Sequence, residues 1–340
     1  MRLEIILWKT CVAACLIGSW LHAQPKVGLV EVFGAHRTGR GKIEAAAGAK
    51  AGGPLPRSRV EAEENIEAIG GIVQARVEAV CCERGEAILY IGVQERGSAV
   101  PEFLPEPAED LSLPDAALEA YREYTQALER AGRGGETEDS LAEGHALSAG
   151  PAVRAAQERM LALGEERAGE LRQVLRRSQD SEQRAIAAFT IQYLRDKGAV
   201  AEDLQKALRD AGEGVRRNAM RSLEALAVLA RRDPASGVKV SGVWLVELLN
   251  SLVWSDRVGA ARTLLVLTET PGPHLTANIK ERALVSLAET AAWKHLPHAL
   301  PAFLLLGRVA GWTDNQTQQA WSSGEREQAI ERMRRALRPR

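Results

Sequence analysis

Three segments in the C-terminal half of this chain repeat one pattern of four residues, which constrains the fold more than any other feature. In each, apolar residues follow an arginine three, seven and ten positions later: Arg184, Ala187, Ile191 and Leu194; Arg216, Ala219, Leu223 and Leu226; Arg257, Ala260, Leu264 and Leu267. At 3.6 residues per turn, the apolar positions share one face of a helix. A leucine-bearing stretch precedes each segment, so the pattern predicts successive pairs of helices.

The arginines and nearby acidic residues give these pairs a second regularity. Asp180, Asp210 and Asp256 precede or begin the three helices, and the arginines are 32 and then 41 residues apart, from Arg184 to Arg216 to Arg257. The block resembles HEAT repeats, best over 210–226, where Val215, Arg216, Ala219 and Leu223 match the family pattern. The resemblance implies an α-α solenoid over residues 151–340. It also implies a hydrogen-bond ladder along the stack, made by Asp180, Arg184, Asp210, Arg216, Asp256 and Arg257.

The end of the chain is expected to continue this array. We predict a fourth, degenerate helical pair over 277–312, with Pro297 between its helices and Pro301 inside one of them. Residues 325–337 are predicted to form a terminal capping helix, since a stack of repeats needs a polar outer face at its end.

Residues 26–96 carry a different pattern, a small α+β domain with the order β-α-α-β-β. A β-branched strand over 26–33 precedes two helical stretches, 41–51 and one that opens at the capping residue Ser58. Gly70 and Gly71 end the second helix, and alternation then predicts a hairpin of two strands. In the first of these strands, Val73, Ala75, Val77 and Ala79 are expected on one face and Gln74, Arg76 and Glu78 on the other.

This segment resembles a POTRA domain, a periplasmic module of outer-membrane assembly and secretion proteins. The matching residues are Val32-Phe33-Gly34, Gly52-Gly53-Pro54-Leu55, the stretch 66–72 and Val93-Gln94-Glu95, although Ile72 stands where the family often has an aromatic residue. The resemblance implies the strand order first, third, second, with an open edge at 73–79. A partner could add a strand there, and the predicted protein-binding residues are Val73, Gln74, Ala75, Arg76, Val77 and Glu78. The alternative is an edge that is only solvated or is covered by the following linker.

The first 23 residues read as a signal peptide. Arg2 and Lys9 supply a basic start, an apolar stretch follows, and Ala23 ends the segment before Gln24. We therefore predict export to the periplasm, with two alternatives: a lipoprotein anchored at Cys15, or an uncleaved membrane anchor, for which the apolar run is too short. We predict no membrane span in the mature chain.

Between the two regions, residues 97–114 form a predicted linker with four prolines, and 115–150 a helix followed by a mobile glycine-rich loop. Cleavage leaves only the adjacent Cys81 and Cys82. Neighbouring strand residues point to opposite faces, so we do not expect them to staple the fold.

No residue set predicts catalysis, a metal or a cofactor. His295 and His298 have a spacing that suits two metal ligands on a helix, but Pro297 lies between them, and a solvated helix end is the preferred interpretation. His145 near Glu143 is assigned a hydrogen-bonding or exposed role. The arginine-rich end over 332–340 is read as a solvated helix terminus rather than a lipid-binding patch.

The sequence thus predicts a mainly α protein: a HEAT-like solenoid preceded by a POTRA-like domain. A formal net charge of -1 argues against a nucleic-acid partner. The predicted function is that of an exported, non-catalytic adaptor or scaffold that binds other proteins, possible partners being envelope or outer-membrane assembly components. The alternatives are an enzyme similar to the HEAT-repeat lyases that attach bilins, and a purely structural envelope component.

Overall fold

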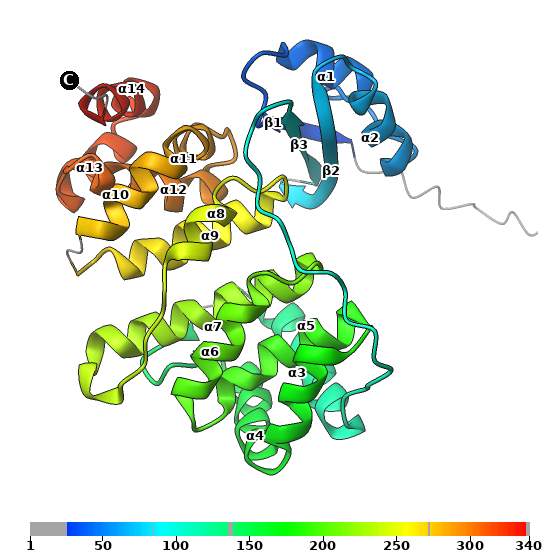
Figure 1. Ribbon diagram of the computed structural model, residues 1–340, viewed down its shortest axis with the longest axis vertical. Coiled ribbons are helices and arrows are strands. Elements are labelled where there is room, and N and C mark those ends of the chain that lie inside the picture. Colours follow the sequence, from blue (N-terminus) through cyan, green and yellow to red (C-terminus); the bar gives the residue numbers. More distant parts are fainter. Residues whose placement is uncertain (1–25, 84, 135–138, 271–272, 338–340) are drawn as a thin grey trace, which may run out of the picture.

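The computed structural model describes residues 26–83, 85–134, 139–270 and 273–337. The chain is mainly helical, with a small three-stranded sheet near its N-terminus (Figure 1). The predicted signal peptide lies outside the described residues. Within them, no helix combines the length and the apolar character needed to cross a membrane.

The N-terminal domain has the element order that the sequence predicts. It consists of β1 (Val27–Phe33), α1 (Arg40–Ala46), α2 (Arg59–Glu67), β2 (Ile72–Glu83) and β3 (Glu86–Glu95). The strand order is β1-β3-β2, with β1 parallel and β2 antiparallel to β3, so β2 lies at an edge as expected. Cys81 and Cys82 fall at the end of β2, but their side chains are outside the described part.

The alternation in β2 holds for its central residues and fails at its start. Ala75 and Val77 are buried beneath α1 and α2, as predicted. Val73, expected on the same face, is 54% exposed. A register shift between Ile72 and Gln74 causes this difference, because an extra residue in a strand reverses the direction of the side chains before it.

The proline-rich segment 97–114 is packed along the helices instead of spanning open solvent. The Leu104 N–H donates to the Arg209 carbonyl at 2.8 Å, and the Gln179 N–H donates to the Glu109 carbonyl at 2.7 Å. Leu113 is buried in the helical core. Figure 1 shows this segment leading from the sheet to the far end of the helical region.

The helical region folds back from that far end toward the sheet (Figure 1). The helices that carry the repeated arginines contact one another in the order α5, α7, α9, and their alanines Ala187, Ala219 and Ala260 are fully buried. The helices are α3 (Asp115–Gly134), α4 (Pro151–Arg177), α5 (Ser181–Thr190), α6 (Lys197–Ala207), α7 (Glu213–Arg232), α8 (Val243–Leu248), α9 (Trp254–Leu267), α10 (Pro273–Arg282), α11 (Leu284–Ala291), α12 (Leu296–Val309), α13 (Asp314–Ser322) and α14 (Arg326–Leu337).

The glycine-rich loop is more ordered than predicted. Residues 135–138 lie outside the described part, but β4 (Asp139–Ser140) and β5 (Leu147–Ser148) form an antiparallel pair. The Ala146 and Ser148 N–H groups donate to the amide oxygens of Gln192 and Gln157. Buried glutamines therefore satisfy the main chain of the loop and hold 139–150 against the helices.

The C-terminal part also departs from the prediction of one pair over 277–312. Three helices, α10, α11 and α12, cover this range, and α13 follows where no helix was predicted. Pro297 lies in the first turn of α12, where a missing N–H has no intrahelical partner to lose. Pro301 lies inside the same helix, as expected, and α14 occupies the predicted capping region.

Helices cover both faces of the sheet. One face packs on α1 and α2. On the other face, Phe33, Ile88 and Tyr90 form a cluster with Trp293 and Ala299 of the C-terminal helical region. The N-terminal domain therefore packs against the helical region through a second apolar core.

Candidate binding cleft between the sheet and the helices

Three buried arginines connect successive helices. Each guanidinium pairs with a carboxylate that lies further along the chain, and the arginine residues are at most 2% exposed. The pairs, with their nitrogen–oxygen distances, are Arg184–Asp210 (2.8 Å), Arg216–Asp256 (2.8 Å) and Arg257–Glu289 (2.9 Å).

Each of these arginines also donates to the main-chain carbonyl six residues before it. Arg184 Nη1 donates to Ser178 at 2.8 Å, Arg216 Nη1 to Asp210 at 2.8 Å, and Arg257 Nε to Ser251 at 2.7 Å. The same side chain thus closes the turn before its own helix and contacts the next one. Such multiple hydrogen bonds are what a buried guanidinium needs to offset its lost hydration.

Asp180 has a different role from the other predicted ladder residues. It caps α5, and its side chain accepts the N–H groups of Glu182 and Gln183. It pairs with none of the three arginines above. Conversely, Glu289 is the partner of the last arginine, Arg257. The sequence pattern did not identify it because its segment does not follow the repeated four-residue spacing.

The series of ion pairs ends on the sheet domain. Glu289, which holds Arg257, also accepts the Gly34 N–H at the end of β1. Nearby, the buried Glu31 carboxylate accepts the N–H groups of Lys294 and His295, just before α12. Burial raises the pKa of Glu31 despite these hydrogen bonds. Two carboxylates therefore attach β1 to the α11–α12 region.

Both histidines assigned to a solvated helix end lie instead in the core beneath the sheet. His295 is 9% exposed, and its ring contacts that of His298 at a centroid distance of 4.1 Å. His298 stacks on Trp254 at 4.4 Å, and its Nδ1 lies 2.6 Å from the Tyr90 hydroxyl. Burial lowers the pKa of His298 to about 4. The prediction was wrong because the helix start faces the sheet, which local sequence does not reveal.

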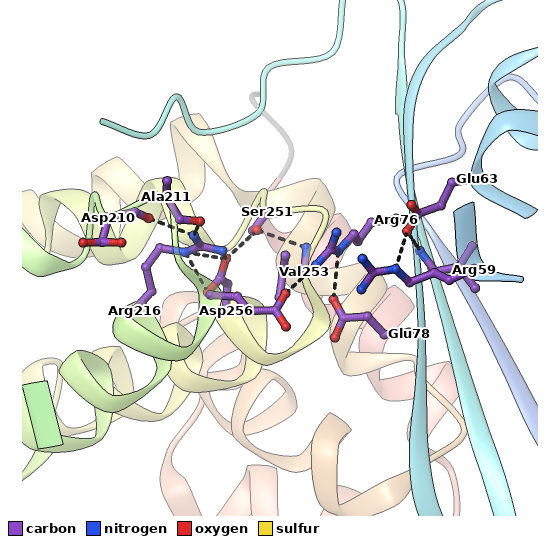
Figure 2. A network of polar contacts seen from close by, with 12 residues as sticks. Arg59, Glu63, Arg76, Glu78, Asp210, Ala211, Arg216, Ser251, Val253 and Asp256 are labelled. Atoms are coloured by element: carbon purple, nitrogen blue, oxygen red, sulfur yellow. Dashed lines mark hydrogen bonds and ion pairs between the residues drawn. The ribbon is translucent and has the colours of Figure 1, made fainter. Parts of the chain in front are cut away.

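A cleft opens where β2 meets the helices. It has a volume of about 360 Å³, with Gln74 and Arg76 on one wall, Phe103 of the proline-rich segment on another, and the starts of α7 and α9 opposite. Arg76 crosses it and pairs with Glu213, the first residue of α7, at 2.8 Å. Figure 2 shows Arg76 and Glu78 pointing from the strand toward the helices.

Phe103 connects the cleft to the buried ion pairs. Its ring lies 3.8 Å from the guanidinium carbon of Arg216, a cation–π distance. Arg216 also lines the cleft. Its partner Asp256, in the first turn of α9, is fully buried and lies between Arg216 and Ser251 (Figure 2). Phe103 therefore contacts the side chain that pairs α7 with α9.

Glu78 is an acid of this site with a raised pKa. Burial raises its pKa to about 7, and the neighbouring Glu213 carboxylate acts in the same direction, against Arg76. Its Oε1 lies 3.6 Å from Arg76 Nε. The side chain lines a second hollow of about 370 Å³, together with Leu55, Pro56 and Glu213.

The edge of β2 is less open than predicted. The N–H groups of Ala75 and Val77 donate to Glu67 and Glu63 of α2, at 2.9 and 2.8 Å. Helix α2 thereby occupies two donors that strand addition would use. This corrects the expected row of unpaired backbone groups at 73–79, and it gives α2 the role of protecting the edge.

The six predicted protein-binding residues consequently have different surroundings. Gln74 and Arg76 line the cleft, and Glu78 lines the second hollow. Ala75 and Val77 belong to the core, and Val73 is exposed. Phe103 and Glu213 complete the cleft. Sequence reasoning missed them because one lies in a presumed linker and the other 137 residues beyond its partner Arg76.

Comparisons with known proteins give no match: no family model, no curated protein and no solved structure is significantly similar to this chain. Across the described residues, no group of three or more His, Cys, Asp or Glu side chains is arranged to hold a metal ion. The cleft offers arginine, glutamine, main-chain and aromatic groups, which suit non-covalent recognition of a polypeptide.

Proposed function

We propose that this protein is an exported adaptor of the cell envelope that binds a segment of another protein in the cleft between β2 and the starts of α7 and α9. In this proposal the helices form a HEAT-like solenoid and the sheet a POTRA-like module. The support for export is the basic and apolar N-terminal sequence that ends at Ala23. The support for binding is the cleft.

One observation carries the binding proposal: three separate parts of the chain form the walls of one open hollow. The strand contributes Gln74 and Arg76, and the proline-rich segment contributes Phe103. The loops before α7 and α9 contribute Gly212 and Leu252. Gly212 and Val253 precede α7 and α9 without a side-chain cap, which leaves the helix N-termini suited to carbonyl or carboxylate oxygens. An extended segment with an acidic residue and a small apolar residue fits these walls.

Site-specific photo-crosslinking tests this function. A photoreactive amino acid replaces Gln74 or Val100 in the cleft, and Val285, which is 54% exposed on α11, serves as the control. We expect one defined protein to be crosslinked from both cleft positions and not from 285. Gln74→Trp, which fills the cleft, should abolish that product.

Equal crosslinking from position 285, or an adduct that survives Gln74→Trp, would contradict the proposal. N-terminal sequencing of the exported protein tests the envelope location separately. We expect a mature chain that begins at Gln24; one that begins at a lipid-modified Cys15 supports the anchored alternative.

A further inference from the structure

A polar site lies at the start of α6, away from both hollows described above, and shares no residue with the cleft. Its hollow has a volume of about 410 Å³, with Leu161 of α4 and Leu194 supplying an apolar wall and Glu165 and Arg195 a charged one. His145 of the hairpin loop and Lys197, the first residue of α6, also line it. The adaptor function proposed above assigns no role to these residues.

Lys197 is held in an unusual way for a lysine. Its Nζ donates to the Gln192 carbonyl and lies 3.2 Å from His145 Nδ1. Its position at the N-terminal end of a helix is unfavourable for a positive charge, because the helix dipole is positive there. Burial lowers the pKa of Lys197 to about 8, although the carboxylates of Glu143 and Glu165 oppose the shift.

The hydrogen bonds of His145 give an independent reason for a neutral amine. The residue is 8% exposed, and its Nε2 is buried with no hydrogen-bond partner among the described residues. A buried N–H without an acceptor is costlier than a buried lone pair, so the ring proton belongs on Nδ1. There it donates to the Glu143 carbonyl at 3.2 Å.

This tautomer decides which form of lysine fits. With its proton on Nδ1, the ring has no lone pair to offer to the Lys197 ammonium 3.2 Å away. The neutral amine can accept that proton or stand beside it without repulsion. Burial lowers the pKa of His145 to about 4, so the ring itself stays uncharged near neutral pH.

We propose that this hollow binds a small aldehyde and that the Nζ of Lys197 forms an imine with it. The amine lone pair attacks the carbonyl carbon and forms the carbon–nitrogen bond. The carbonyl oxygen then leaves as water with the two hydrogens of the amine, so the step requires no oxidant or reductant. A buried amine of lowered basicity is the form in which lysine acts as a nucleophile.

The walls of the hollow narrow the class of aldehyde. Leu161 and Leu194 give the carbonyl carbon an apolar surface, and Arg195, whose side chain is 86% exposed, stands at the rim beside Glu165 at 2.9 Å. A carboxylate on the aldehyde can pair with Arg195 while the carbonyl group lies near Lys197. Glyoxylate has both groups and is the probe of choice.

The test is reductive trapping of glyoxylate on the wild-type mature protein, with cyanoborohydride to fix the imine and peptide mapping to locate it. Seven exposed lysines in the same chain act as internal controls, namely Lys26, Lys42, Lys50, Lys206, Lys239, Lys280 and Lys294. At about pH 7.5 we expect Lys197 to react at least tenfold faster than these residues, because far more of it is present as free amine. Its rate should also saturate with glyoxylate concentration.

Two results would overturn the proposal. Modification of Lys197 no faster than that of the exposed lysines means that the amine is not activated. A rate that stays linear in glyoxylate means that no binding site exists. Lys197→Arg should remove only the fast phase, whereas Lys206→Arg, a change on the same helix, should leave it intact.

Discussion

The Glu289 carboxylate accepts the main-chain N–H of Gly34 through both of its oxygens, at 2.9 and 3.0 Å. The same carboxylate holds Arg257, so one side chain joins the end of β1 to the series of buried ion pairs. The N-terminal domain is thereby linked to the helix contacts that begin at Arg184, far from it in the chain.

We predict that Glu289→Gln destabilises the protein by roughly 2 to 4 kcal/mol, because it leaves the buried Arg257 guanidinium without a counter-charge. Denaturant unfolding measures this change. Glu269→Gln is the matched control: Glu269 pairs with Arg231 on the surface, where both side chains are at least 33% exposed, and should cost less than about 1 kcal/mol. Equal losses of unfolding free energy in the two variants would show that the Arg257–Glu289 pair contributes no more to stability than a surface pair.

Gly92 of β3 lies against the loop before α9. A Cβ atom at this position would lie 2.2 Å from the Leu252 carbonyl oxygen, a main-chain atom that cannot move aside cheaply. We therefore expect Gly92→Ala to lower the free energy of unfolding by roughly 1 to 3 kcal/mol, the usual cost of overpacking, and to expose the sheet to protease.

Gly41→Ala provides the comparison for this substitution. Gly41 lies in α1, and a Cβ there would meet nothing within 4 Å. Alanine in a helix is favoured over glycine, so this variant should be neutral or more stable by up to about 1 kcal/mol. A tolerated alanine at 92 would mean that the loop before α9 does not press on β3.

The packing of the helices is tested at Leu223, which is fully buried on the repeated face of α7. Leu223→Ala should cost roughly 2 to 5 kcal/mol, since it removes buried methyl groups and leaves a cavity. Leu296→Ala, at a position 52% exposed, should change stability by less than about 1 kcal/mol. Thermal unfolding followed by circular dichroism measures both. An unchanged melting temperature of Leu223→Ala would contradict the packing of Leu223 in the core between the helices.

The raised pKa of Glu78 predicts that the stability of the protein depends on pH. Its folded-state pKa of about 7 is raised above the ordinary 4.5, so the folded protein holds this proton more tightly than the unfolded chain. The resulting stabilisation is complete below pH 4.5 and is lost as the pH rises through about 7. It amounts to about 3 kcal/mol, since 1 pKa unit corresponds to about 1.4 kcal/mol.

Glu78→Gln removes this titration and isolates its contribution. The histidines with lowered pKa values, His145 and His298, add stability above their ordinary range and lose it as the pH falls toward 4, and they do so equally in both proteins. The difference in unfolding free energy between wild type and variant should therefore move against wild type between pH 4.5 and 7. A difference that is constant with pH would place Glu78 in an ordinary, hydrated environment.

The order of elements in the N-terminal domain and the helices of the repeated segments follow from local sequence. Alternation of apolar residues gave β2 its inner face at Ala75 and Val77, and the spacing from Arg216 to Leu223 gave α7 its buried face. These features depend on residues within a few turns of one another, so periodicity in the chain determines them.

The contacts between the sheet and the helical region, including the one at the cleft, depend on distant parts of the chain. Arg76 meets Glu213, Gly34 meets Glu289, and Tyr90 meets His298 only because the helical region folds back onto the sheet. Local periodicity tells which face of an element is buried, but not which other element buries it. That choice is made by the combined lengths of the helices and loops between the partners, and so only the tertiary structure decided where this protein has its cleft.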